Sequence, residues 1–189
     1  MSEPSEAGPL VALDVGYFTD GAKGAPTMSD GGADFAVAAA VTFSDWDDES
    51  PTAETRVRIA PVAPYEPGQF FRRELPCLLG VLEALPEAPR TIVVDGHVWL
   101  SDGEPGLGAH LHRAINARAA VIGVAKGSFR GSPDAHQVLR GESRQPLYVT
   151  AVGVEAGAAA ALIRRLHGPF RIPTLLKRVD ALSRDPHLP

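Results

Sequence analysis

Apolar runs and alternating patterns predict three consecutive strands near the start of the chain. Residues 10–17 (LVALDVGY) are apolar apart from Asp14, which indicates a buried strand with a carboxylate inside it. Residues 35–44 (FAVAAAVTFS) form a second apolar run, and residues 55–62 (TRVRIAPV) alternate between apolar and basic positions. Stretches rich in Gly, Asp and Ser separate these runs, so we expect antiparallel strands joined by loops.

Helical and strand patterns alternate through the rest of the chain. Residues 69–85 place six large apolar side chains on one helical face, and Pro76 is expected to kink this helix. Residues 90–100 (RTIVVDGHVWL) have a buried-strand pattern in which the apolar residues give way at Asp95 and Gly96. We further predict helices at 108–116, 155–167 and 174–183, strands at 119–125 and 146–152, and a polar loop at 127–145.

This order of elements predicts one α/β domain over residues 10–189, with residues 1–9 as a flexible tail. The three antiparallel strands come first, and the alternating strands and helices that follow are typical of a parallel extension of the same sheet. Helices are expected to flank this mixed sheet. A length of 189 residues fits a single domain.

Composition narrows the class of protein further. The chain is 44% hydrophobic and 22% charged, as in globular proteins. No apolar run approaches the roughly 18–20 residues that span a bilayer, and the first ten residues lack the pattern of a secretory signal. We therefore expect a cytoplasmic protein with no membrane partner. Cys77 is the only cysteine, which excludes an intramolecular disulfide and a cysteine-rich zinc site.

Charge is divided unevenly along the chain, although the net charge is only −5. Residues 1–109 carry 6 basic and 18 acidic side chains, whereas residues 110–189 carry 12 basic and 5 acidic ones. A basic block of this kind can attract a polyanion even in an acidic protein. It can equally be a solvated surface without a partner.

Three acids stand out by their positions: Asp14 within the first strand, Glu74 on the first helix and Asp95 where the fourth strand ends. If the first and fourth strands are neighbours, these carboxylates meet, and a divalent ion such as Mg²⁺ would neutralise them. Such a site activates water and stabilises charge on a phosphate. The alternative is that each acid pairs separately with an arginine such as Arg72 or Arg73.

Several segments resemble the endonuclease V family in order and spacing, from about residue 10 to residue 182. They are LDVGY (13–17), PYEPGQFFRRELP (64–76), VVDGH (93–97), GVAKG (123–127), PLYVTAVG (146–153) and FRIPTLLKRVD (170–180). The resemblance implies a ribonuclease H-like fold. It also implies metal-dependent cleavage of DNA near deoxyinosine or another deaminated base, with RNA as the substrate of some members.

Carried over residue by residue, the resemblance implies roles for four side chains. Asp14 and Asp95 would hold Mg²⁺ directly, with Mn²⁺ as a possible replacement, and Glu74 would complete the metal site. Lys126 would steady the scissile phosphate or the leaving group.

The resemblance also implies contacts with nucleic acid. Pro64 and Tyr65 match the wedge that enters the duplex while the altered base is received in a pocket. Gly96 and Gly106 would let the backbone approach that base closely. His110 lies in GLGAHL (106–111), which resembles the helix start after the second aspartate. We expect the protein to act as a monomer.

The chain also departs from the family pattern. Val154 stands where the family has a histidine that supports the metal site, and Glu155 or His97 could substitute for it. Ser101 and Asp102 replace a His-Pro pair in the recognition loop. Two alternatives therefore stay open: a catalytically weakened nucleic-acid-binding or regulatory relative, and a relative that acts on a small phosphorylated substrate.

Overall fold

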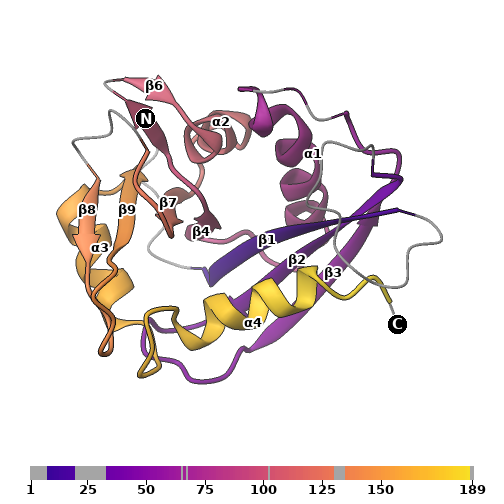
Figure 1. Cartoon of the computed structure of the whole chain (residues 1–189). Helices are drawn as coiled ribbons and strands as arrows, with labels where there is room; N and C mark the ends of the chain where they lie inside the picture. The colour runs from indigo at the N-terminus through magenta and orange to yellow at the C-terminus, as the bar shows by residue number, and fades with distance from the viewer. Residues whose placement is uncertain are drawn as a thin grey trace.

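A mixed seven-stranded sheet forms the centre of the molecule (Figure 1). The computed structural model describes residues 8–19, 33–64, 66, 68–101, 103–129 and 135–187. The strands lie in the order β3-β2-β1-β4-β7-β9-β8. Their bounds are β1 Leu10–Phe18, β2 Phe35–Phe43, β3 Ala53–Ile59, β4 Thr91–Asp95, β7 Ala120–Ala125, β8 His136–Val138 and β9 Leu147–Val152.

The pairing of the strands confirms the predicted layout. β1 pairs antiparallel with β2, and β2 pairs antiparallel with β3. β4 runs parallel to both β1 and β7, which is the expected parallel extension. β9 pairs antiparallel with β7 and with β8, so the far edge of the sheet reverses direction.

Helices cover both faces of the sheet because its strands alternate their side chains between the two faces. α1 (Phe70–Glu83) and α2 (Leu107–Ala114) pack on one face, and α3 (Ala156–Arg165) and α4 (Thr174–Ser183) pack on the other. In β1, Val11 and Leu13 belong to the α1–α2 layer, whereas Leu10 and Ala12 belong to the α3–α4 layer. Asp14 has the same alternation as Leu10 and Ala12, so it faces α4.

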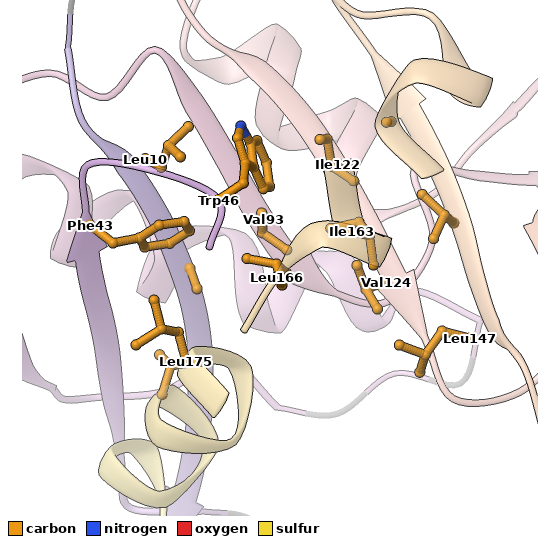
Figure 2. Packing of buried hydrophobic residues seen from close by; sticks show 14 of the residues in the cluster. Leu10, Phe43, Trp46, Val93, Ile122, Val124, Leu147, Ile163, Leu166 and Leu175 are labelled. Carbon is orange, nitrogen blue, oxygen red and sulfur yellow. The ribbon is translucent and has the colours of Figure 1, made fainter. Parts of the chain in front are cut away.

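The α3–α4 layer has a continuous apolar core (Figure 2). Phe43 and Trp46 meet edge to face, with ring centroids 6.1 Å apart. Ile163 from α3 and Leu175 from α4 are buried in the same cluster as Ile122 of β7. No helix within the described part of the chain is long and apolar enough to cross a membrane.

Two segments differ from the sequence prediction. The strand predicted at 90–100 ends at Asp95, because Gly96 has a φ of 125° that breaks the extended backbone. The chain then forms a separate hairpin of β5 (Trp99–Ser101) and β6 (Glu104–Pro105). The loop predicted at 127–145 contains the short strand β8.

The predicted N-terminal tail is described only at its end. Pro9 accepts a backbone hydrogen bond from Arg90 at 3.0 Å. Residues 1–7 of this tail lie outside the described residues.

Two arginines hold the connection between α3 and α4. Arg140 is buried, and its guanidinium donates hydrogen bonds to the carbonyls of Leu166, Gly168 and Phe170. Arg171 donates to the backbone carbonyls of Lys126 and Pro146. These bonds fix the start of α4 against the end of β7.

Candidate active site

Asp14 lies in β1 beneath α4 and is tied to it. Ser183 Oγ donates to Asp14 Oδ2 at 2.6 Å and also lies 3.0 Å from the Asp180 carbonyl. Two residues beyond Asp14, a Cβ on Gly16 would lie 2.1 Å from the Ser183 carbonyl oxygen. The missing side chain at Gly16 therefore allows α4 to approach β1 closely enough for the Ser183 contact.

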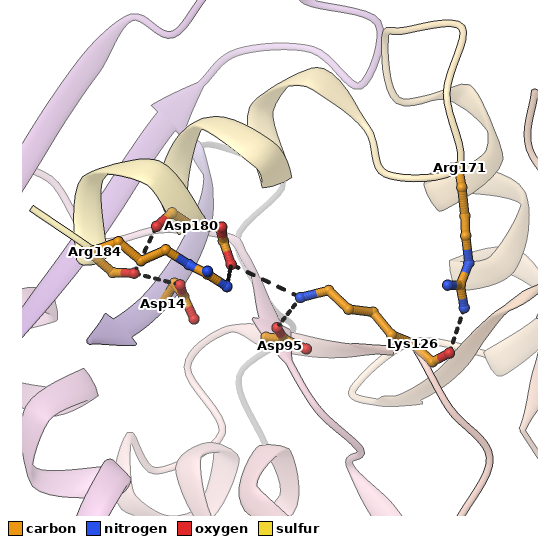
Figure 3. A network of polar contacts seen from close by, with 7 residues as sticks. Asp14, Asp95, Lys126, Arg171, Asp180 and Arg184 are labelled. Atoms are coloured by element: carbon orange, nitrogen blue, oxygen red, sulfur yellow. Dashed lines mark hydrogen bonds and ion pairs between the residues drawn. The ribbon is translucent and has the colours of Figure 1, made fainter. Parts of the chain in front are cut away.

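Asp95 and Lys126 meet at the edge of the sheet where the parallel strands β4 and β7 end (Figure 3). Lys126 Nζ lies 3.0 Å from Asp95 Oδ2 and 3.9 Å from Asp180 Oδ1. The side chains of Asp95 and Lys126 are 45% and 49% exposed, so both are accessible to a ligand. Strands that run parallel end on the same side, which brings these residues together across 31 positions of sequence.

Asp180 is a functional candidate that the sequence reasoning missed. It lies on α4, and Arg184 Nη2 contacts its Oδ1 at 2.9 Å. Asp180 is four residues after Leu176 and three before Ser183, so it lies on the inward face of the helix. An acid on an otherwise apolar helical face was the available signal, but nothing in the sequence linked that face to Asp14.

Glu74 is 6% exposed and approaches from α1, on the other face of the sheet. Among the described residues, its Oε2 has no hydrogen-bond partner. Burial raises the pKa of Glu74 well above its usual value, and the negative charges of Asp14 and Asp95 raise it further. The guanidinium of its neighbour Arg73, which lies 3.9 Å over the Tyr17 ring, opposes this rise.

The acids and Lys126 act on one another electrostatically. Burial raises the pKa of Asp14 to about 6, the Ser183 hydrogen bond opposes this, and the charges of Asp95 and Asp180 add to it. Burial alone would lower the pKa of Lys126, but its hydrogen bond to Asp95 and the nearby acids outweigh burial and raise it. Lys126 therefore stays protonated and positively charged among these acids.

The donor chemistry of this acid cluster, which consists of Asp14, Glu74, Asp95 and Asp180, suits a hard divalent ion. Carboxylate oxygens are the ligands that Mg²⁺ prefers, and Glu74 has a buried oxygen without a partner among the described residues. As the side chains stand, however, no three His, Cys, Asp or Glu residues in the described ranges form a group that could hold a metal. Metal ligation therefore stays a prediction, and it requires rearrangement of these side chains.

The predicted nucleic-acid contacts fall in several places. Gly96 has a positive φ and open space where a Cβ would project. Gly106 has a structural role, since its Cβ would lie 2.4 Å from the His97 carbonyl oxygen. The ring of His110 stacks on Phe71 of α1, with centroids 3.7 Å apart. Pro64 is exposed, and Tyr65 lies outside the described residues.

The possible substitutes for the family histidine are engaged elsewhere. Val154 packs against the α3–α4 core. Glu155 begins α3, where its carboxylate accepts hydrogen bonds from the amides of Gly157 and Ala158 at 2.9 and 2.7 Å. His97 Nε2 lies 3.1 Å from the Gly127 carbonyl and so bridges the loops after β4 and β7. The additional carboxylate beside Asp14 is therefore that of Asp180, whereas Glu155 and His97 make other contacts.

Sequence comparisons find relatives that are named endonuclease V. An endonuclease V of Rhodospirillum centenum is 34% identical over 145 residues, which are 66% of this chain and 59% of the relative. An endonuclease V of Thermus thermophilus is 34% identical over 139 residues, 60% of this chain and 59% of the relative. The chain thus spans less than two thirds of the length of these relatives.

Solved structures share the fold. Endonuclease V of Ciona intestinalis, in complex with DNA containing an inosine, superposes with a TM-score of 0.76 at 18% identity, covering 95% of this chain and 85% of that one. Endonuclease V of Streptomyces avermitilis gives a TM-score of 0.69 at 28% identity, covering 96% and 82%. The expected ribonuclease H-like fold is confirmed. The family model of Endonuclease V matches residues 21–178, and the chain therefore belongs to the endonuclease V family.

Proposed function

We propose that the protein is a metal-dependent endonuclease that hydrolyses a phosphodiester bond near deoxyinosine or another deaminated base in DNA, with RNA as a further substrate. The observation that carries this proposal is the Lys126 ammonium between Asp95 and Asp180, beside the partly buried Asp14, in a chain of this family. The Ciona relative was solved with DNA containing an inosine, which supports a nucleic-acid substrate.

In this proposal Asp14, Glu74 and Asp95 hold Mg²⁺ or Mn²⁺, and Asp180 would be a fourth carboxylate at the ion. The bound ion would supply Lewis-acid stabilisation of charge on the phosphate and a nucleophilic water. Lys126 would exchange its contact with Asp95 for one with a phosphate oxygen, because its ammonium is half exposed at the strand edge. Asp14, held by Ser183, would keep its orientation during this exchange.

Base recognition in this proposal involves the region around Gly96, where the backbone is open to an approaching ring. Pro64 and Tyr65 would separate the strands beside the altered base. Removing a base from its stack costs least at a poorly paired position, which suits a deaminated base. The cytoplasmic location and the monomeric state stay predictions from the sequence.

The test is a nicking assay on inosine-containing oligonucleotides, as DNA and as RNA, beside matched strands without inosine. Each is assayed with Mg²⁺, Mn²⁺, Ca²⁺ or EDTA. We expect cleavage of the inosine strands only, dependent on Mg²⁺ or Mn²⁺, and lost in Asp95→Asn and Glu74→Gln. Glu83→Gln is the matched control, because it makes the same substitution at an exposed position of the same helix.

Two results would replace this proposal. Salt-sensitive binding of the oligonucleotides without cleavage at any ion concentration would identify a binding or regulatory relative. Hydrolysis of small phosphorylated compounds, but not of polymers, would identify a relative that acts on a small phosphorylated substrate.

A further inference from the structure

A pocket of about 530 Å³ opens directly beside the acid cluster, on the α4 side of the sheet. This volume is in the range of small-molecule binding sites, which is roughly 300–1,000 Å³. Nine apolar and seven charged residues line it. Asp14, Asp95, Lys126 and Asp180 are four of the charged ones, so the pocket and the proposed catalytic groups share one wall.

The apolar part of the lining does not suit a phosphate. Val124 and Leu147 from the sheet, Leu176 from α4 and Ile172 from the preceding loop are apolar. Phe170 adds an aromatic ring that is 68% exposed. A phosphate placed here would lose its hydration without compensation, whereas a flat heteroaromatic ring would bury its faces against apolar walls and could stack on Phe170.

The basic lining residues favour a ligand that also carries phosphate. Besides Lys126 these are Arg171, Lys177 and Arg184; Arg171 already donates to backbone carbonyls and Arg184 to Asp180. Lys177 and Arg184 are exposed on α4. An apolar pocket with cations on its lining and catalytic carboxylates on one wall is complementary to a nucleotide unit whose phosphate lies at the acid cluster.

The pocket is also on the opposite side of the sheet from the region assigned above to the altered base. Gly96 leads into Val98, which belongs to the α1–α2 layer, while α4 belongs to the α3–α4 layer. The acid cluster lies between these layers, with Asp14 facing α4 and Glu74 coming from α1. A strand whose scissile phosphate lies at the cluster thus has one flanking nucleotide near each layer.

We propose that this pocket receives the base of the nucleotide that flanks the scissile phosphate on the side away from the altered base. The inference rests on the proposed nuclease function and specifies its substrate. The two nucleotides that flank the cut, one on each side, would then leave the base stack in opposite directions. The preferred substrate is a single strand, or a duplex that is unpaired at both positions.

The first experiment changes only the substrate. The wild-type protein is assayed on single-stranded inosine oligonucleotides that carry a base-free spacer at one position at a time on each side of the cut. We expect binding in Ca²⁺ to weaken by about 5- to 100-fold at one flanking position, the range for loss of one stacked base. Spacers further along the strand should have little effect.

The second experiment changes the pocket. Leu176→Trp fills it, and Phe170→Ala removes an exposed ring at no risk to the core. Leu182→Trp is the matched control, since Leu182 lies on the same helix and is also partly buried but does not line the pocket. With 2-aminopurine at the flanking position, binding to wild type and Leu182→Trp should change its fluorescence, and both pocket variants should lose that change.

The outcomes separate the two proposals. If wild type neither binds nor cuts any inosine strand, the nuclease proposal fails and the pocket inference falls with it. If wild type cuts inosine strands, and neither the spacers nor the pocket variants alter binding more than the control does, only the pocket inference is overturned.

Discussion

Asp14→Asn is expected to make the protein more stable while removing its activity. The carboxylate of Asp14 is held in a poorly hydrated position near Asp95 and Asp180, and its pKa is raised to about 6. An amide has nearly the same shape and can still accept the hydrogen bond from Ser183. The substitution therefore removes the unfavourable charge and retains the contact that ties β1 to α4.

The size of this effect follows from the pKa. A rise from 3.8 to about 6 corresponds to about 3 kcal/mol, at about 1.4 kcal/mol per pH unit. An acid whose pKa is higher in the folded state binds more protons when folded, so folding loses stability as the pH rises from 3.8 to about 6. Asparagine does not undergo this loss. The variant should exceed wild type by about 1–3 kcal/mol near pH 8 and match it near pH 4.

Urea unfolding across this pH range measures the difference. Asp47→Asn, which removes an exposed acid, is the control and should change stability by less than about 0.5 kcal/mol. Adding Mg²⁺ should stabilise wild type but not Asp14→Asn, if Asp14 is a ligand. Equal or lower stability of Asp14→Asn near pH 8 would refute the claim that burial and neighbouring acids destabilise this carboxylate.

Three further predictions concern other parts of the structure. Lys126→Met should lower the cleavage rate by about 100-fold or more in a single-turnover nicking assay, and a rate within a few-fold of wild type would remove Lys126 from the mechanism. Gly16→Ala should cost about 1–3 kcal/mol in urea unfolding, because the new Cβ meets the Ser183 carbonyl. An unchanged midpoint would show that α4 can shift freely. Two backbone amides lower the pKa of Glu155, so the stability that it adds is present above about pH 4.5 and lost as the pH falls through its lower folded value. Thermal melts of Glu155→Gln should approach wild type in acid, and a constant difference would contradict the capping role.

The strand-borne parts of the site could be predicted from the sequence. Asp14 interrupts an apolar run, and Asp95 stands where another run ends, so both positions were visible as costly or exposed acids in a sheet. The parallel pairing of β1 with β4 follows from the same alternation of strands and helices. The positions of the two acids depend on residues close together in sequence, which is why pattern analysis finds them, whereas the strand pairing depends on the order of elements along the chain.

Asp180 could not be predicted in the same way. It belongs to a short amphipathic helix in which charged residues are usually solvated, and its partner Asp14 lies far away in the chain. Only the packing of α4 across β1, which Gly16 permits, brings the two acids together. The roles of Gly106 and His110 were also hidden, because each depends on a contact between separate elements, with His97 and Phe71 respectively.

The position of Asp180 late in the chain has a consequence for biosynthesis. A ribosome releases the chain from its N-terminus, and the sheet residues of β1 to β9 all emerge before α4. An unfinished chain therefore has Asp14 and Asp95 but not the helix that carries Asp180 and the Ser183 contact. Translation products that stop before α4 would therefore lack Asp180 and the Ser183 contact, and with them the complete acid cluster.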